Sequence, residues 1–81
     1  MNYLLIVFSS RRDATAFYEA LQTAGYNAFI INTPRALQLS CGISVKTSTD
    51  ALPAIRRLLS CGNYDSFVGV YYYTFGRYSK M

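Results

Sequence analysis

The order of apolar and polar positions along the chain predicts four strands. A continuous apolar run, Tyr3–Phe8, is typical of a central strand that is buried on both faces. A second apolar run covers Tyr26–Ile31. The segment Gly42–Thr47 alternates between apolar and polar residues, which predicts a half-buried strand. The last strand is expected over Phe67–Phe75, which is rich in tyrosine.

Helical spacing follows the first strand and predicts a helix over Arg11–Ala24. Ser10 and Asp13 resemble a capping box in which aspartate replaces the usual glutamate. Gly25 falls where a glycine commonly ends a helix, because it accepts a left-handed conformation. The first crossover between strands is therefore predicted to be this helix.

A second helix is predicted between the third and fourth strands. Asp50 and its neighbours offer N-caps, and Pro53 fits a first helical turn, where its missing N–H costs little. Apolar residues from Leu52 to Leu59 then recur on one face. Cys61 and Gly62 are expected to end this helix.

These elements predict a single α+β domain over residues 1–81. With right-handed crossovers, their order gives a ferredoxin-like βαββαβ fold. The expected sheet is antiparallel and four-stranded, in the order 4-1-3-2, with both helices on one face. The polar tail, Gly76–Met81, is expected to fray.

Composition adds an expectation about assembly. Hydrophobic residues make up 52% of the chain and charged residues 15%, which suits a compact domain. A chain of 81 residues has a thin core, so a homodimer through the open sheet face would cover remaining apolar surface. The rings of Tyr71–Tyr73 fit such an interface. A weak RNA-binding surface is the less favoured interpretation, because the predicted third strand carries no aromatic residue.

Several functional classes are disfavoured. The chain has no histidine, which excludes Ser-His-Asp and Cys-His catalysis, and its four acids are dispersed. We therefore expect neither a metal nor a cofactor. The net charge of +4 comes from scattered residues, which disfavours nucleic acid as a partner. The longest apolar run is far shorter than the ~20 residues that span a bilayer, so we expect a cytoplasmic protein without membrane contact.

The long irregular segment Thr33–Gly42 carries the candidate chemistry. In the predicted topology its cysteine, Cys41, lies at the same end of the sheet as the start of the first helix. A helix N-terminus carries about half a positive charge, and Arg11 and Arg35 add full charges nearby. We expect a thiol there to ionise more easily than a free cysteine. The alternative is that Cys41 is a small buried hydrophobe, the commonest role of a lone cysteine.

Other residues of this end are expected to support the thiol. Ser10 begins the first helix, and Gly42 allows a backbone or a partner to approach the sulfur closely. Cys61, at the end of the second helix, is a candidate resolving thiol that could form a disulfide with Cys41.

A series of short features in this order also resembles a known family. The features are an apolar strand, a serine, an Asp-Ala pair, a Thr-Pro-Arg turn and a Cys-Gly pair: Tyr3–Phe8, Ser9-Ser10, Asp13-Ala14, Thr33-Pro34-Arg35 and Cys41-Gly42. In these features the chain resembles a bacterial Se/S carrier protein-like family over roughly residues 1–59. The spacing from arginine to cysteine is the most specific part. The chain departs from the family's serine-rich loop at Gln38 and Leu39, and in its aromatic C-terminus and Cys61.

The resemblance implies a carrier rather than an enzyme. Cys41 would accept sulfur or selenium as a persulfide-type adduct from a donor protein and pass it to an acceptor protein. Arg35 would help to hold the thiolate, and Ser40 and Gly42 would shape the loop. The alternative function is a non-catalytic interaction or dimerisation module, with RNA binding as a third.

Overall fold

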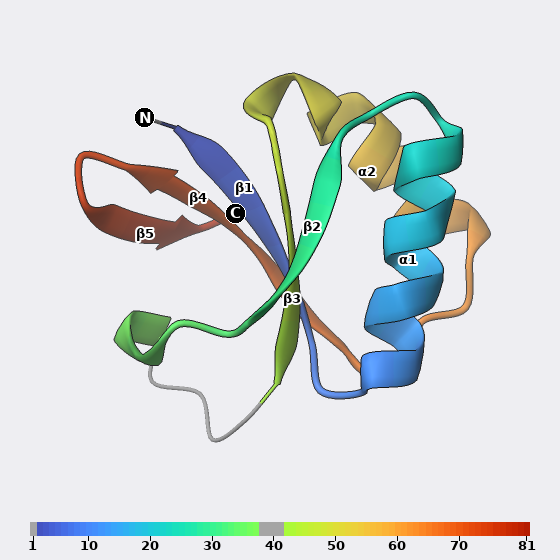
Figure 1. The fold of residues 1–81 in the computed structure, drawn as a ribbon, viewed down its shortest axis with the longest axis horizontal. Coiled ribbons are helices and arrows are strands. Elements are labelled where there is room, and N and C mark those ends of the chain that lie inside the picture. The colour runs from blue at the N-terminus through green and yellow to red at the C-terminus, as the bar shows by residue number, and fades with distance from the viewer. Residues whose placement is uncertain (1, 38–41) are drawn as a thin grey trace.

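The computed structural model describes residues 2–37 and 42–81 of the chain (Figure 1). In chain order, its strands, α-helices and short 3₁₀ turns are β1 (Tyr3–Phe8), α1 (Arg11–Thr23), β2 (Ala28–Asn32), η1 (Arg35–Leu37), β3 (Ile43–Thr47), η2 (Thr49–Ala51), α2 (Leu52–Cys61), β4 (Phe67–Thr74) and β5 (Arg77–Lys80).

The sheet is antiparallel and has five strands, in the order β2-β3-β1-β4-β5. Both helices pack on one side of it, which makes an α+β fold (Figure 1). The predicted four-stranded ferredoxin-like layout, in the order 4-1-3-2, is therefore wrong. The tail Gly76–Met81 was expected to fray, but most of it forms β5 along the free edge of β4.

A two-residue turn makes the fifth strand possible. Phe75 and Gly76 have φ values of 51° and 76°, and two positive φ angles in succession give the turn whose twist matches a hairpin. The Met81 N–H donates to the Val70 carbonyl at 2.8 Å, which closes the far end of the hairpin. The left-handed conformation costs Phe75 about 1 kcal/mol relative to glycine.

The core lies between the helices and one face of β1. Leu4, Ile6 and Phe8 point into it and meet apolar residues of both helices. The largest of these on α1 is Phe17, whose ring centroid lies 5.5 Å from that of Phe8. β1 pairs with β3 on one side and β4 on the other, so it is the central strand that its apolar run predicts.

The opposite face of the sheet, which we call the open face, carries no α-helix among the described residues. Leu5 lies on it and is fully buried, because Lys46 and Tyr71 are its direct neighbours on the adjacent strands. Tyr3 stacks on Tyr73 with ring centroids 4.5 Å apart. The Lys46 ammonium lies 4.4 Å from the centroid of the Tyr3 ring.

Tyr78, on β5, completes what we call the tyrosine cluster: Tyr3, Tyr73 and Tyr78. Its ring centroid lies 4.9 Å from that of Tyr73, and its hydroxyl lies 2.9 Å from the Tyr3 hydroxyl. Burial, helped by this hydrogen bond, raises the pKa of Tyr78 to about 12. Tyr3 stacks face to face on Tyr73 and lies edge-on to Tyr78, and Lys46 lies over the Tyr3 ring, so the cluster is a poor platform for stacking nucleobases.

Removing the Tyr3 hydroxyl tests this cluster. The neutral form of Tyr78 is favoured in the folded protein, so its stabilising effect disappears as pH rises from 10.0 towards about 12. In Tyr3→Phe we expect the phenol that ionises at the highest pH to ionise at a lower pH than in the parent protein. We also expect the free energy of unfolding to fall by about 1 kcal/mol. Tyrosinate absorbance during an alkaline titration, with thermal unfolding at neutral pH, measures both. Tyr18→Phe, on α1, is the control and should retain the late transition; an unchanged transition in Tyr3→Phe would contradict the assignment.

Candidate functional site

The candidate site lies at the end of the sheet where β1 stops. Phe8, the last residue of β1, pairs with Ile43 of β3 and with Phe67 of β4. Ser9 follows, and its N–H donates to the Ser66 carbonyl at 2.9 Å. The start of α1, the start of β3 and the approach to β4 therefore meet at one end of the sheet, although they are far apart in the sequence.

The Thr33–Gly42 segment leaves and rejoins the sheet at this end through a closed neck. The Thr33 N–H donates to the Gly42 carbonyl at 3.2 Å, and the Thr33 and Ser44 hydroxyls lie 2.8 Å apart. We call Thr33, Gly42 and Ser44 the loop neck. The residues between Thr33 and Gly42 therefore start and finish at a point that hydrogen bonds fix to the sheet.

Gly42 is required by a close approach of two backbones. A Cβ atom at this position would lie 2.8 Å from the Phe8 carbonyl oxygen and 3.2 Å from the Thr33 hydroxyl. The carbonyl belongs to the central strand and cannot move aside. The sequence predicts that Gly42 lets a backbone or a partner approach the Cys41 sulfur, and that stays a prediction. The contact that the structure shows is between Gly42 itself and the backbone of Phe8.

Asp13 links the start of α1 to the approach to β4. Its carboxylate accepts from the Ser66 hydroxyl at 2.6 Å and from the Ser66 N–H at 2.9 Å. These two bonds, with a smaller effect from the nearby Arg12 charge, hold the pKa of the Asp13 carboxyl below its usual range. Ser10 caps α1 as predicted, since its Oγ accepts from the Asp13 N–H at 3.4 Å. A capping box would place the Asp13 carboxylate on the Ser10 N–H. In the structure the carboxylate instead binds Ser66.

The predicted site residues are only partly brought together. Ser10 and Arg11 begin α1 at the same end of the sheet as Gly42, and Arg11 is exposed. Arg35 is also exposed, but its turn η1 lies on the open-face side of the sheet, opposite the helices (Figure 1). The positive charges expected around the thiol therefore divide between two sides of the sheet.

Of the two cysteines, the structure describes Cys61 and not Cys41. Cys61 is the last residue of α2 and is a free, exposed thiol. Cys41 and Ser40 lie outside the described residues, so the reactive thiol and its pairing with Cys61 stay predictions from the sequence.

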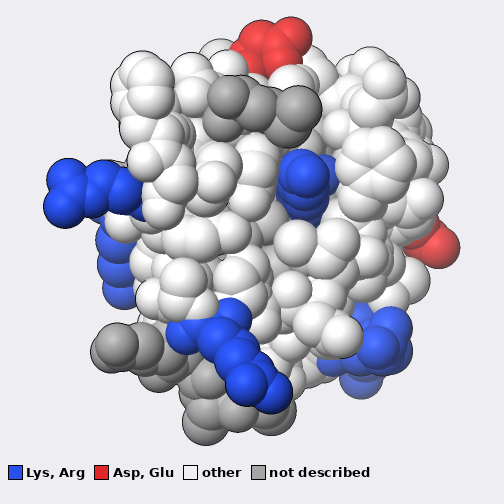
Figure 2. Space-filling view, turned by 60° about the vertical axis from the view of Figure 1, so that its left-hand side comes forward, with Lys and Arg blue, Asp and Glu red and all other residues white. Residues whose placement is uncertain are grey.

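The surface charge follows the secondary structure. All four acids, Asp13, Glu19, Asp50 and Asp65, lie on helices, turns or loops, and the strands carry only basic charges. Figure 2 turns the left-hand side of Figure 1 forward. Lys and Arg are spread apart on the face it shows, and Asp and Glu appear only at its margins. The open-face side is therefore mildly basic without a continuous basic stripe.

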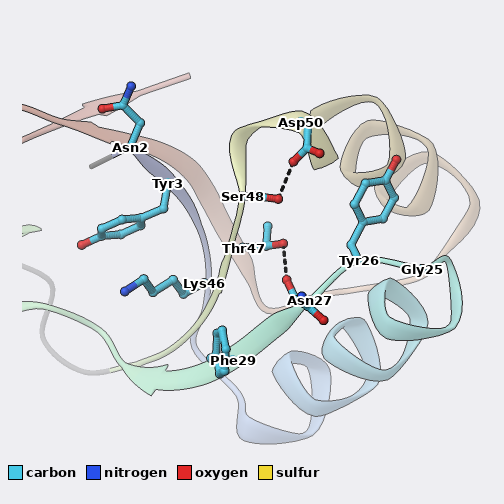
Figure 3. Close-up of a pocket in the computed structure, with 10 residues that line it drawn as sticks. All are labelled: Asn2, Tyr3, Gly25, Tyr26, Asn27, Phe29, Lys46, Thr47, Ser48 and Asp50. Carbon is cyan, nitrogen blue, oxygen red and sulfur yellow. Dashed lines mark hydrogen bonds between the residues drawn. The ribbon is translucent and has the colours of Figure 1, made fainter.

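A hollow of about 360 Å³ lies at the other end of the sheet (Figure 3). Its walls include Tyr3, Phe29 and Lys46 of the strands and Asp50 after β3. The two charged side chains that line it already have partners within the chain. The Lys46 ammonium lies over the Tyr3 ring, and the Asp50 carboxylate accepts a hydrogen bond from the Ser48 hydroxyl. None of the predicted site residues that the structure describes is among its lining residues.

The fold and the sequence together define a small α+β domain with a cysteine-bearing segment between the two ends of a closed neck. The profile of the family described as Putative Se/S carrier protein-like matches residues 3–66, which include the loop neck and Cys41. The chain belongs to this family. No curated protein and no solved structure matches it. Within the described residues, no helix is both long enough and apolar enough to cross a membrane.

Gly42→Ala tests the close approach at the neck. The new methyl group must displace the Phe8 backbone, so we expect folding to weaken by about 2 kcal/mol. Gly69→Ala is the matched control. Its Cβ would meet the Lys80 side chain at 2.9 Å, and that flexible chain can move away. Chemical denaturation of both variants measures the difference, and equal costs would show that the neck is not unusually tight.

Asp13→Asn tests the link to Ser66. The lowered pKa means that the stabilising effect is complete above the ordinary value of 3.8 and is lost as pH falls through the lower folded-state value. The variant should therefore melt at a lower temperature at neutral pH and lose less stability on acidification. Thermal unfolding at a series of pH values measures this, with Glu19→Gln, an exposed acid of the same helix, as the control. A parallel acid decline in Asp13→Asn and the parent protein would contradict the role of Asp13.

Proposed function

We propose that this protein is a sulfur or selenium carrier that uses Cys41 as its acceptor thiol. The observation that carries the proposal is the family match over residues 3–66, because the matched region contains the Cys41-Gly42 pair and both ends of its loop. A carrier function needs one accessible thiolate and no general base, which suits a chain without histidine.

The proposed chemistry is exchange at sulfur. The Cys41 thiolate attacks the terminal sulfur of a donor persulfide, the donor's sulfur–sulfur bond breaks, and the donor cysteine leaves as a thiolate. Cys41 then holds the transferred atom as a persulfide, and an acceptor thiolate removes it by the same step. Selenium would follow the same path, and no net oxidant is needed.

The described residues support this role by fixing the base of the loop. The loop neck and the Phe8 contact hold Gly42 against the central strand. Ser10 and Arg11 would supply the electropositive start of α1 at this end. Arg35 would act from the open-face side, where a donor or acceptor protein can reach it, and Ser40 would complete the loop around the thiol.

The other parts of the proposal concern assembly and location. Cys61 is exposed, as a resolving thiol requires. Its thiolate would attack the Cys41 sulfur of the persulfide, which forms a Cys41–Cys61 disulfide and releases the outer sulfur as hydrosulfide. The homodimer through the sheet face stays a prediction, as does the cytoplasmic location. Dimerisation is not needed to bury Leu5, since neighbouring strands of the same chain already cover it.

Persulfide loading of the two thiols tests the carrier function. Reduced protein is incubated with glutathione persulfide, alkylated and digested, and the extra sulfur atom is located by mass spectrometry. We expect it on Cys41, and we expect Cys41→Ser to lose most loading while Cys61→Ser keeps it. The iodoacetamide labelling rate of Cys41 should reach its half-maximum at a pH below the ~8.5 of a free cysteine.

The controls separate a carrier thiol from an inert one. Arg35→Gln should slow loading of Cys41 without lowering the midpoint of thermal unfolding, because Arg35 is exposed. Loading confined to Cys61, or a Cys41 that resists iodoacetamide until the protein unfolds, would reject the proposal and favour the non-catalytic interaction module.

A further inference from the structure

The edge of the sheet that β2 forms is open and unprotected. Among the described residues, β2 is hydrogen-bonded to β3 on one side and to no strand on the other (Figure 1). A strand at the edge of a sheet presents unpaired N–H and C=O groups to which another strand can bind, and natural edges are usually blunted by charges, proline or a bulge. β2 contains no charge and no proline over Ala28–Asn32, and its register with β3 runs without a bulge.

The pairing with β3 determines which backbone groups of β2 are unpaired. The Thr33 N–H donates to the Gly42 carbonyl, and the Asn27 carbonyl accepts from the Thr47 hydroxyl, so both residues face β3. In an antiparallel strand the backbone groups of successive residues point to opposite sides. The odd-numbered residues of β2 therefore face β3. The N–H and C=O groups that point away from the sheet belong to Ala28, Ile30 and Asn32.

The side chains of β2 add an apolar surface beside this edge. Phe29 pairs with Lys46, which in turn pairs with Leu5, so Phe29 and Ile31 lie on the open face. The Phe29 side chain is 62% exposed, and Ile31 is only half-buried. Unpaired backbone groups and uncovered apolar side chains thus occur together along one strand.

We propose that two copies of this protein associate through this edge, with β2 paired antiparallel to β2 of the second copy about a two-fold axis at Ile30. The axis places Ile30 opposite Ile30 of the second copy, and Ala28 opposite Asn32 of the second copy. Every outward-pointing residue then meets an outward-pointing residue, and each such pair exchanges two hydrogen bonds. The interface is the sheet edge and not the sheet face, and it does not depend on the chemistry of Cys41.

The same axis makes the side chains of β2 self-complementary, which favours a second copy over an unrelated strand. Phe29 of each copy lies opposite Ile31 of the other, at the positions where antiparallel strands approach most closely. An aromatic ring opposite a β-branched residue is a favourable cross-strand pair, and the axis forms this pair twice. The pairing that satisfies the backbone groups therefore also covers the exposed ring.

The other edge of the sheet offers no equivalent surface. β5 has four residues, and two of them, Arg77 and Lys80, are charged. Pairing two copies along β5 would bring these cations close to the same cations of the second copy. In the β2 pairing, the Lys46 residues of the two copies stand three strand spacings apart, about 14 Å, where salt screens most of their repulsion. The assembly should therefore close as a dimer.

Sedimentation equilibrium from micromolar to millimolar concentration tests the proposal. The parent protein should show a reversible equilibrium between monomer and dimer. Phe29→Lys places a charge against Ile31 in both cross-strand pairs, so we expect its dimer to dissociate about thirty-fold more readily. Phe75→Lys makes the same change at another exposed ring, 94% exposed on the β4–β5 turn, and should dimerise like the parent protein. Thermal unfolding of the dilute monomers shows whether each variant keeps its fold.

A mixture of two variants tests the register of the pairing. Ile31→Glu alone should also weaken the dimer. In a mixed dimer of Phe29→Lys and Ile31→Glu, the two new charges lie opposite each other in one cross-strand pair, and the other pair keeps its native residues. The mixture should therefore dimerise more tightly than either variant alone. In the parent protein, amide hydrogen exchange should be slower at high than at low concentration for Ala28, Ile30 and Asn32.

The remaining outcomes each contradict the proposal. A protein that stays monomeric at every concentration would leave the edge to a strand of another protein. A dimer that Phe29→Lys does not weaken would indicate association through the sheet face. Growth into larger polymers, no gain on mixing the two variants, or amide protection unchanged along β2 would exclude the two-fold pairing at Ile30.

Discussion

Burial of β1 on both of its faces is the constraint on which the rest of the structure depends. Residues Leu4–Phe8 are almost completely inaccessible to solvent, yet the helices cover only one side of the strand. On the other side the described residues form no α-helix, and Leu5 is flanked there by side chains of the neighbouring strands. Tyr71 and Lys46 flank Leu5 there, and the tyrosine cluster lies beside them. Adding β5 to the sheet supplies Tyr78 and with it the last ring of that cluster.

The same strand gives the candidate site its rigidity. β1 ends at Phe8, whose carbonyl lies against Gly42, and the next residue is hydrogen-bonded to Ser66. The base of the cysteine-bearing segment is therefore attached to the best-packed part of the molecule. Asp13 adds a second connection from α1 to Ser66. Such an arrangement holds the two ends of the segment, Thr33 and Gly42, against the sheet.

The molecule divides into two regions with different chemistry. The region matched by the carrier family contains β1, both helices and the loop neck, and it holds the electropositive start of α1. The β4–β5 hairpin follows that region, is basic and aromatic, and stabilises the fold through Tyr73 and Tyr78. The side chain at its tip, Phe75, is 94% exposed. A single sheet thus connects the loop neck to this hairpin.

The local pattern of apolar and polar residues was enough to predict most of the secondary structure of this chain. Periodicity located β1, β3, β4 and both helices, and Ser10 was recognised as a cap, because these features depend on residues a few positions apart. The spacing of Arg35 and Cys41 is likewise a property of the sequence alone. β5 was missed because a four-residue strand forms only when β4 is present to pair with it. The contact of Asp13 with Ser66 joins residues 53 positions apart, and the separation of Arg35 from α1 depends on which side of the sheet the segment takes. Those outcomes arise from packing between distant segments, and therefore only the tertiary structure decides them.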